Sequence, residues 1–419
     1  MRTHVFKNLA ARASNQPECL SQRSAGIPKR TVQDSRVLST SRYVASTRKR
    51  NVRSAPQVCT AVSSPQSRRM SLAEDPTSNP FSGFEDPSVN RVLPYNLSQM
   101  RGVKEKERLR IFSGTSNPQL SQEIANYLGL ELGDINIKRF ADGEVYVQVL
   151  ESIRGCDVFL CQPTCPPAND NLMELLVMID ACRRASAKSV TAVLPYFGYA
   201  RADRMTSGRE SIAAKLVANM LTEAGADRVL ALDLHSGQCV GYFDIPVDHV
   251  YGSVVILDYL AAKLTSTEDT VVVSPDVGGV ARARAFAKKL NDAPLAIIDK
   301  RRQGHNTAEV MNLIGDVEGK TCVMVDDMVD TAGTLQKGAE LLHKMGAKEV
   351  LACASHAVFS PPAAERLSSD LFQEVIVTNS MPISPDKQFQ QLTVLSVANL
   401  LGEAIWRMHN ETSVKDILE

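Results

Sequence analysis

Hydrophobic and polar positions follow two alternating periods through most of the chain after residue 108. Short apolar runs of strand type, beginning with residues 109–114, are separated by segments with helical spacing, beginning with residues 117–128. Later strand-type runs are centred near Leu232, Val273, Ile298, Val325 and Ala354. Strands that alternate with helices predict an α/β fold with mostly parallel sheets covered by helices on both faces.

One unit of this pattern occurs twice. Residues 157–160 predict a strand, which is followed by a loop, a helix at residues 171–186 and a second strand that begins with Ala-Lys-Ser-Val. The same order recurs later in the chain, with a helix at residues 335–345 followed by Ala-Lys-Glu-Val. This internal similarity indicates two copies of one α/β domain.

Composition separates the first 70 residues from the rest. They contain 14 Lys and Arg against two acidic residues, so the remaining chain has a net charge of −12 although the whole chain is neutral. Abundant Ser and Thr without the apolar core of a secretory signal are typical of a transit peptide, and they favour the chloroplast stroma over the mitochondrion. A basic tail that contacts nucleic acid is the alternative, but no folded basic motif supports it.

The predicted organisation follows from these shifts in composition. It consists of a transit peptide at residues 1–70, a linker at 71–108, a first domain at 109–250, a second domain at 251–409 and a tail at 410–419. No apolar run reaches transmembrane length, so we expect no membrane partner. Because no aromatic interleaving or folded basic motif is present, we expect no nucleic-acid partner either.

The nine cysteines are scattered, and several lie inside apolar runs. This pattern predicts buried thiols in a reducing compartment. Cys161 and Cys165 have the spacing of a metal-binding pair, but no second pair accompanies them, so we expect no zinc site.

The most informative motif lies between Thr321 and Thr334. The sequence predicts that a strand at residues 322–325 ends at two adjacent aspartates, and that a loop of small residues then opens a helix. Backbone amides and the helix dipole converge at such a loop and favour an anion, while carboxylates accept hydrogen bonds from vicinal sugar hydroxyls. The motif therefore predicts a sugar-phosphate site. Its binding residues would be Asp326, Asp327, Asp330, Thr331, Ala332, Gly333 and Thr334.

Two alternatives to this site remain. An aspartate-rich DDxxD string also occurs as a magnesium-diphosphate clamp on helices, but the residues before Asp326 are of strand type. The aspartates could also form an acidic surface turn without a ligand. Two carboxylates directly after a buried strand are costly unless they are solvated or bound to a partner.

The string VDDMVDTAGT resembles the phosphoribosyl diphosphate loop of the type I phosphoribosyltransferase fold. The chain from about residue 111 to about residue 409 resembles the ribose-phosphate diphosphokinase family. The resemblance implies two tandem type I phosphoribosyltransferase-like domains. It also implies transfer of the diphosphoryl group of MgATP to the anomeric hydroxyl of ribose 5-phosphate, which yields 5-phosphoribosyl 1-diphosphate and AMP for nucleotide biosynthesis.

The two copies differ at the loop that follows the corresponding strand. In the first copy this loop is residues 162–167, QPTCPP, which lacks paired acids and loses amide donors at its prolines. We therefore expect only the second copy to bind ribose phosphate. In the resembled family the first copy holds ATP together with a neighbouring subunit.

The resemblance also assigns roles to individual residues. The implied ATP-binding residues are Phe140, which would stack on adenine, Asp142, Glu144, Arg201, Asp203 and His235. The implied Mg²⁺ ligands are His235 and Asp276, with Asp233, Asp244 and Asp248 as further candidates. The implied catalytic residues are Lys300 and Arg302 on a mobile loop, and His235.

Each of these motifs is weaker without the family. A Phe beside an Asp-Gly turn is usual in a hairpin, and the basic run at residues 299–305 could be a solvated loop. His235 could be a hydrogen-bonded structural histidine. Ala202 occupies a position where many relatives have glutamine, so this position contributes little to the resemblance.

The motifs allow three functions: a ribose-phosphate diphosphokinase, a phosphoribosyltransferase and a non-catalytic regulatory paralogue of the diphosphokinase. A phosphoribosyltransferase that consumes the diphosphate typically needs one such domain, whereas this chain has two. A non-catalytic regulatory paralogue should lose charged loop residues that are present here. The resemblance implies a homo-oligomer of the hexamer-of-dimers type, because relatives commonly form rings of dimers. It also implies ADP inhibition and phosphate activation at a subunit interface, and Ser152 and Arg154 fall in the matching region.

Overall fold

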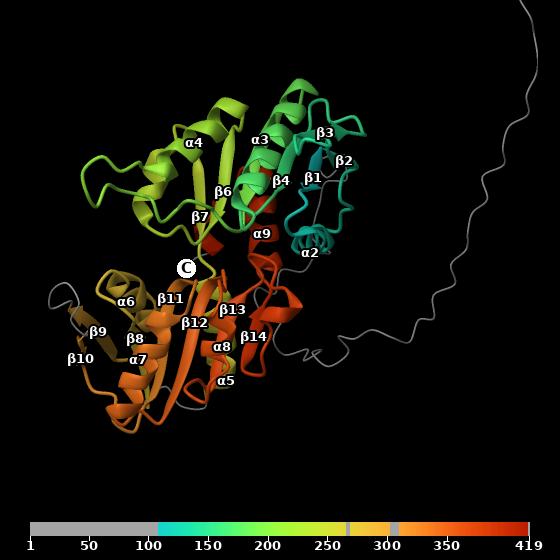
Figure 1. The fold of residues 1–419 in the computed structure, drawn as a ribbon. Coiled ribbons are helices and arrows are strands. Elements are labelled where there is room, and N and C mark those ends of the chain that lie inside the picture. Colours follow the sequence, from blue (N-terminus) through green and yellow to red (C-terminus); the bar gives the residue numbers. More distant parts are fainter. Residues whose placement is uncertain (1–107, 265–268, 302–309, 418–419) are drawn as a thin grey trace, which may run out of the picture. The chain divides into compact units, whose positions relative to one another are not determined.

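The computed structural model describes residues 108–264, 269–301 and 310–417. The predicted transit peptide and almost all of the predicted linker lie outside these residues. Two sheets and a hairpin form the described part of the chain, and helices pack on both sheets (Figure 1).

The first half is built on a five-stranded sheet in which all neighbours are parallel. In sheet order its strands are β1 (Leu109–Ser113), β4 (Asp157–Cys161), β5 (Ser189–Leu194), β6 (Arg228–Leu232) and β7 (Val247–Val250). An antiparallel hairpin of β2 (Ile135–Arg139) and β3 (Val145–Val149) packs beside it against α3. The helices of this half are α2 (Pro118–Leu128), α3 (Ala168–Arg184) and α4 (Ala213–Ala224), with the short 3-10 helix η2 (Gly237–Tyr242).

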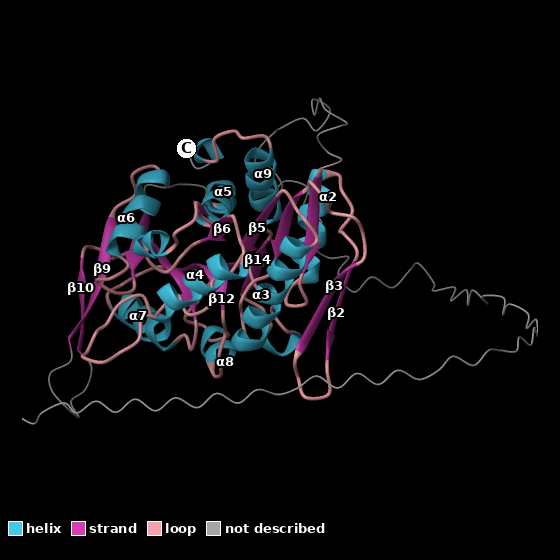
Figure 2. Ribbon diagram, turned by 90° about the horizontal axis from the view of Figure 1, so that it is seen from above, coloured by secondary structure: helices cyan, strands magenta, loops and turns pink. Residues whose placement is uncertain are grey.

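The second half is built on a seven-stranded sheet, parallel except for one edge pair. In sheet order its strands are β10 (Val310–Ile314), β9 (Leu295–Arg301), β8 (Thr270–Ser274), β11 (Thr321–Val329), β12 (Glu349–Ala357), β13 (Glu374–Thr378) and β14 (Leu392–Leu395). Its helices are α5 (Ser253–Lys263), α6 (Val280–Lys289), α7 (Gly333–Lys344) and α8 (Ala363–Leu367). The predicted α/β class with mostly parallel sheets is confirmed (Figure 2).

The strands are nearly continuous apolar runs because both faces of each sheet are covered. Strands β4, β8 and β13 are buried at every position. Helices α3 and α4 pack on one face of the first sheet, and α7 and α8 pack on one face of the second. The remaining faces of the two sheets share one apolar cluster, which includes residues of α2, α5, α6 and α9.

The last helix, α9 (Ala398–His409), returns to the first half. It follows the second sheet in sequence but packs against α2, as Figures 1 and 2 show. Gly402 permits this close approach, because a Cβ there would lie 2.4 Å from the ring of Tyr127. The region predicted as the second domain, residues 251–409, therefore contains a helix that packs on the first.

One predicted strand end is wrong. Strand β11 does not stop before Asp326 but continues through both aspartates to Val329. The reason is its neighbour β12, which is equally long and pairs with β11 from Thr321↔Glu349 to Val329↔Ala357. The loop before α7 is therefore shorter than the sequence pattern indicates.

Other features of the described part agree with the sequence. Its seven cysteines are buried and free, as predicted. Within the described ranges, no helix is long and apolar enough to cross a membrane.

Candidate active site between the two halves

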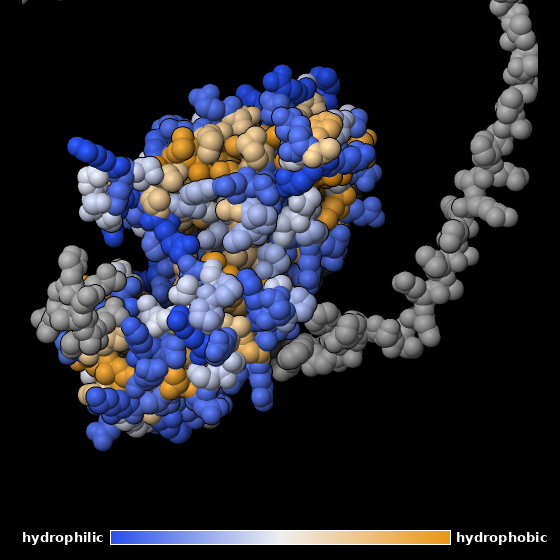
Figure 3. Space-filling view, viewed as in Figure 1, coloured by the Kyte–Doolittle hydropathy of each residue, from blue (hydrophilic) through white to orange (hydrophobic). Residues whose placement is uncertain are grey.

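A cleft of about 1080 Å³ lies between residues of the two halves. The first half contributes the segment after β6, and the second half contributes the start of α6 and the middle of β11. Hydrophilic residues surround the hollow on the face that Figure 3 shows. The predicted site residues that line the cleft are Asp203, Asp233, His235, Asp276, Asp326 and Asp327.

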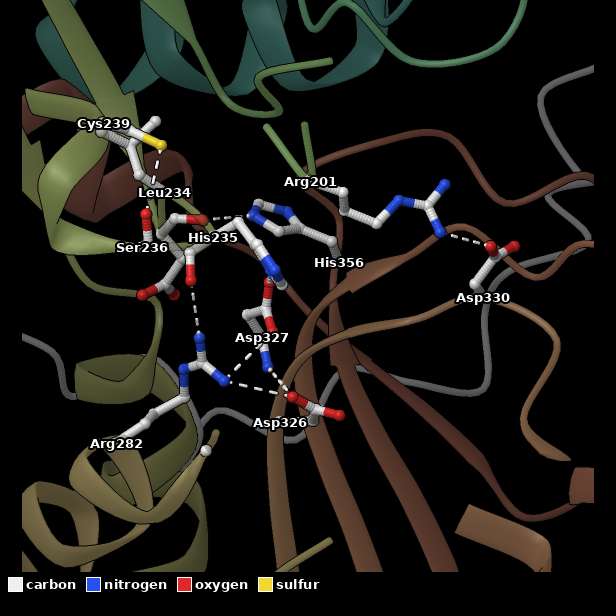
Figure 4. Close-up of polar contacts among 12 residues, drawn as sticks. Arg201, Leu234, His235, Ser236, Cys239, Arg282, Asp326, Asp327, Asp330 and His356 are labelled. Atoms are coloured by element: carbon white, nitrogen blue, oxygen red, sulfur yellow. Dashed lines mark hydrogen bonds and ion pairs between the residues drawn. The ribbon is translucent and has the colours of Figure 1, made fainter. Parts of the chain in front are cut away.

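An ion-pair network occupies the centre of the cleft (Figure 4). His235 Nδ1 lies 2.7 Å from Asp327 Oδ2. Arg282 Nη1 lies 3.1 Å from Asp326 Oδ1 and 3.0 Å from Asp327 Oδ1, and Arg282 Nη2 donates to the His235 carbonyl at 3.1 Å. A residue of the first half, His235, is thus joined to the paired aspartates of the second.

The two aspartates differ in their electrostatics. Burial and the neighbouring charge of Asp327 raise the pKa of Asp326 well above its usual range. Burial alone would also raise the pKa of Asp327, but the hydrogen bond with His235 and the charge of Arg282 hold it well below that range. The hydrogen bond to Asp327 raises the pKa of His235. His235 and Asp327 therefore favour their charged forms together.

The predicted phosphate loop follows β11 directly. Ala332 has a φ of 57°, in the left-handed region, and α7 begins at Gly333. Successive amides around a left-handed residue at a helix start make a concave anion site. Lys300, near the end of β9, donates from Nζ to Thr334 Oγ1 at 2.8 Å. The structure thus brings one predicted catalytic residue to the predicted phosphate loop.

A second contact joins this loop to the first half. Arg201 Nη1 lies 2.6 Å from Asp330 Oδ2, and Figure 4 shows both side chains. Asp203, two residues after Arg201, is buried and lines the cleft. Arg201, predicted to bind ATP, therefore contacts Asp330, predicted to bind ribose 5-phosphate.

Other predicted residues lie away from the cleft. Phe140, Asp142 and Glu144 are in the exposed turn between β2 and β3, where Phe140 is 56% exposed and packs edge-on against Tyr146. Asp244 pairs with Lys215 at 3.3 Å. Asp248 lies in β7, and neither of these two aspartates is among the lining residues. Arg302 lies outside the described residues.

The candidate metal ligands are dispersed. Asp276 follows β8 and faces the cleft, and its Oδ1 accepts from the Gly279 amide at 2.8 Å. Asp233 is buried, and its Oδ2 accepts from the Gly252 amide at 2.7 Å and from the Ser355 hydroxyl. Across the described ranges, no three His, Cys, Asp or Glu side chains lie close enough to hold a metal ion.

Sequence reasoning missed two arginines of the site. Arg282 lies in the first turn of α6 and contacts both aspartates. Arg366, on α8, donates from Nη1 to the Thr331 carbonyl at 2.8 Å. The only local signal was that Arg282 follows the Gly278-Gly279 turn at the start of a helix. No local signal pointed to Arg366.

Comparisons with known proteins agree with this architecture. Residues 109–225 match the N-terminal domain of ribose phosphate pyrophosphokinase, and residues 252–386 match a phosphoribosyl transferase domain. The chain is 75% identical over 332 residues to the rice protein ribose-phosphate pyrophosphokinase 1, chloroplastic, which covers 78% of this chain and 84% of that protein. It is 78% identical over 306 residues to ribose-phosphate pyrophosphokinase 5, chloroplastic, of Arabidopsis thaliana, which covers 73% of this chain and 78% of that protein.

A solved structure is also similar over both halves. The crystal structure of phosphoribosylpyrophosphate synthetase from Mycobacterium smegmatis is 45% identical to this chain, with a TM-score of 0.69. The match covers 73% of this chain and 99% of that one.

Proposed function

The chain belongs to the ribose-phosphate pyrophosphokinase family, and we propose that it transfers the diphosphoryl group of MgATP to the anomeric hydroxyl of ribose 5-phosphate. The anomeric oxygen forms a bond to the β-phosphorus, the bond from that phosphorus to the α-phosphate oxygen breaks, and AMP leaves with 5-phosphoribosyl 1-diphosphate as the other product. The anomeric hydroxyl loses its proton to solvent as its oxygen bonds to phosphorus. The observation that supports this function most directly is the contact of His235 with Asp327 across one cleft.

We assign ribose 5-phosphate to the second half. Its 5-phosphate accepts from the amides and hydroxyls of residues 330–334, and Asp326 accepts from the ribose hydroxyls. Asp327 faces the same place but is also paired with His235, so it connects the sugar to the ATP side. The carboxylates need no metal for this role because hydroxyl groups donate to them directly.

We assign the ATP phosphates to the cleft near His235, Asp203 and Arg201. Mg²⁺ fits the residues present, because it takes few protein ligands and completes its shell with water and phosphate oxygens. His235 and Asp276 would hold it, since both line the cleft. When bound, Mg²⁺ neutralises phosphate charge and helps to orient the diphosphoryl group. Asp233 is already bonded to the surrounding chain and fits the role of a structural anchor better.

The catalytic charge comes from the end of β9. Lys300 Nζ contacts Thr334 Oγ1 at the edge of the phosphate loop. We assign its charge, with substrates bound, to the diphosphoryl group between ATP and the anomeric hydroxyl. Arg302 follows two residues later. Positively charged side chains in this place stabilise the transferring group while it is loosely bonded on both sides.

A homo-oligomer, of the hexamer-of-dimers type, accounts for the hairpin. Phe140 is exposed, and its turn is not among the residues that line the cleft of its own chain. The hairpin is therefore proposed to complete the adenine site of a neighbouring subunit. Ser152 and Arg154 are exposed in the loop before β4, where phosphate and ADP are proposed to act at the subunit interface. Mass measurement in solution, with and without phosphate, tests the assembly.

The site of action is the chloroplast. The rice and Arabidopsis relatives are named chloroplastic, and the matched domains begin at residue 109 of this chain. The basic residues 1–70 act as the transit peptide, with no part in catalysis. Deleting them should leave the specific activity of the purified protein unchanged while a fused reporter no longer enters the chloroplast. Delivery of the full-length fusion to mitochondria would assign the other organelle.

One assay separates the candidate functions. The purified full chain is incubated with MgATP and ribose 5-phosphate, and AMP and 5-phosphoribosyl 1-diphosphate are measured. We expect both products in equal amounts, and neither when ribose 5-phosphate is omitted. A phosphoribosyltransferase would instead consume the diphosphate when a base is supplied. A non-catalytic paralogue would form no AMP by itself.

A further inference from the structure

Two histidines hold the peptide group between Asp233 and Leu234 from opposite sides. His356 Nε2 lies 3.0 Å from the Asp233 carbonyl oxygen, and the Leu234 amide donates to His249 Nε2 at 3.0 Å. The C=O and N–H of a trans peptide point in opposite directions, so the two rings restrain one peptide plane at both ends. His356 comes from β12 of the second half and His249 from β7 of the first.

The partners fix the tautomers of the two rings. A carbonyl can only accept, so His356 Nε2 must bear a hydrogen. His356 Nδ1 lies 2.9 Å from Ser380 Oγ, whose hydroxyl donates to the Ser355 carbonyl at 3.1 Å. A backbone amide can only donate, so His249 Nε2 must lack a hydrogen. The same peptide therefore requires a hydrogen on Nε2 of His356 and none on Nε2 of His249.

The restrained peptide begins at a strained residue. Asp233 has a φ of 40°, in the left-handed region that residues with a Cβ rarely adopt. Its carboxylate is held by the Gly252 amide and the Ser355 hydroxyl. Gly252 is required for this approach, because a Cβ there would lie 2.9 Å from Ser355 Oγ and 3.0 Å from Asp233 Oδ2. Strain of this kind persists only where the surroundings hold it in place.

The strained segment leads directly to His235. Figure 4 shows the His356 ring beside Leu234 and His235, above Asp327. Because only Leu234 lies between Asp233, which has the strained φ, and His235, a rotation of this peptide redirects the imidazole. The ring would then lose its alignment with Asp327, 2.7 Å away in the observed structure.

We propose that His249 and His356 are positioning residues that orient His235 toward the transferring diphosphoryl group. They act through the Asp233–Leu234 peptide rather than through the substrate. The inference rests on the proposed function of His235. It also accounts for a buried histidine of the second half whose ring contacts the backbone of the first.

The kinetic test removes and then restores the hydrogen bonds. His356→Leu and His249→Leu abolish them, whereas His356→Gln keeps a donor and His249→Gln keeps an acceptor at a similar reach. A misplacement of about 1 Å costs about 100-fold in turnover, so we expect the Leu variants to lose at least about 10-fold in kcat. The Gln variants should recover most of that loss. The KM for ribose 5-phosphate should stay within about twofold, because neither ring contacts residues 330–334.

His343→Leu is the matched control, because His343 Nε2 also bonds a backbone carbonyl, that of Leu371, on the exposed side of α7. Its loss should leave kcat unchanged. If the Leu variants do not fold, Gly252→Ala tests the same peptide by displacing the Asp233 carboxylate. Gln variants as impaired as the Leu variants, or a loss confined to the KM for ribose 5-phosphate, would overturn the proposal.

A second measurement is independent of activity. In the full chain labelled with ¹⁵N-histidine, NMR reports which ring nitrogen of each histidine bears hydrogen. We expect hydrogen on Nε2 of His356 and on Nδ1 of His249, with assignments made from the variants. The opposite tautomer at either ring contradicts the two hydrogen bonds to the Asp233–Leu234 peptide, even if the unsubstituted protein forms no AMP. Expected tautomers without AMP formation would instead reject only the proposed function.

Discussion

The guanidinium of Arg201 lies 2.6 Å from the carboxylate of Asp330, and this ion pair joins the proposed ATP segment of the first half to the phosphate loop of the second. Arg201 is 55% exposed at its side chain, so the pair contributes at most about 1 kcal/mol to stability. Its position in the site indicates a functional role instead.

The first prediction separates these two roles. Arg201→Ala and Asp330→Ala should each lower kcat/KM roughly 10- to 100-fold, since a charge-assisted hydrogen bond is worth about 1.5 to 3 kcal/mol. A double-mutant cycle on the free energy of unfolding in urea should give a coupling below about 1 kcal/mol. Removing the exposed Arg184–Asp180 pair on α3 is the control and should change neither quantity. A large coupling in stability with unchanged kinetics would make the pair structural.

The second prediction distinguishes the adjacent aspartates. Asp326→Asn should raise the KM for ribose 5-phosphate about tenfold or more with little change for ATP, because an amide weakens charge-assisted bonds from the sugar hydroxyls. Asp327→Asn should affect both substrates, because Asp327 also bonds His235. Asp316→Asn, at an exposed turn, is the control. Equal effects of Asp326→Asn on the two substrates would assign Asp326 to the metal instead.

The third prediction concerns Arg282. Its guanidinium compensates both aspartates, and the Asp327 side chain is only 4% exposed. Arg282→Ala removes the positive partner of Asp326 and leaves His235 to compensate Asp327, so we expect the free energy of unfolding to fall by about 1 to 3 kcal/mol and activity to fall at least about tenfold. Arg282→Lys should restore only part of the lost stability and activity, because a single ammonium group cannot bond both aspartates and the His235 carbonyl as the forked guanidinium does. Arg284 is exposed on the same helix and serves as the control, so Arg284→Ala should lower neither the free energy of unfolding nor the activity.

The sequence contains enough to predict the fold class but not where each element ends. The run from Cys322 to Val325 is apolar and predicts a strand, which the structure confirms. Its continuation through Asp326 and Asp327 depends on pairing with β12, which is distant in sequence, and two aspartates have low strand propensity. The return of α9 to α2 is likewise a tertiary contact that no local pattern expresses.

The site was predictable where its chemistry is local. Short sequence motifs identify the loop before α7 and His235 near a strand end. In the structure, His235 and the aspartates that precede this loop line the same cleft. Arg282 was missed because a basic residue on an amphipathic helix has the same pattern whether it faces solvent or a carboxylate. His249 and His356 were missed because their partners are backbone groups of another segment, and backbone groups leave no mark in the sequence.

The fourth prediction concerns Arg366 and the phosphate loop. Arg366 Nη1 bonds the Thr331 carbonyl at 2.8 Å, so the Ala332 amide of the same peptide points the opposite way, where we propose that the 5-phosphate binds. Ala332 has a φ of 57° and needs support in that conformation.

Arg366→Ala should therefore raise the KM for ribose 5-phosphate about tenfold, the scale of one hydrogen bond to a charged group, with the KM for ATP unchanged. Arg366→Gln, which keeps a donor, should recover more than Arg366→Met, and binding of inorganic phosphate measured by calorimetry should follow the same order. If Arg366→Lys recovers activity better than Arg366→Gln, the residue acts through charge and not through the Thr331 carbonyl.

The last prediction concerns Lys300 and Arg302. Lys300 Nζ donates to Thr334 Oγ1, so a positive charge already lies at the phosphate loop. Groups that act in the transition state change turnover and leave ground-state binding nearly unchanged. Replacing either residue by Ala should lower kcat by roughly 10³-fold or more, the scale of arginine contributions to phosphoryl transfer, with both KM values little changed.

Two variants make this test specific. Lys300→Arg should not restore full activity, because a guanidinium fork is not a point charge. Lys344→Ala, exposed in the last turn of α7, is the control for loss of a lysine and should have parental kinetics. If kcat of the alanine variants stays within about tenfold of the parent, the charge that stabilises the transferring group must come from elsewhere. Two candidate sources are then Arg204, which lines the cleft, and Arg201, which would have to leave Asp330 to reach ATP.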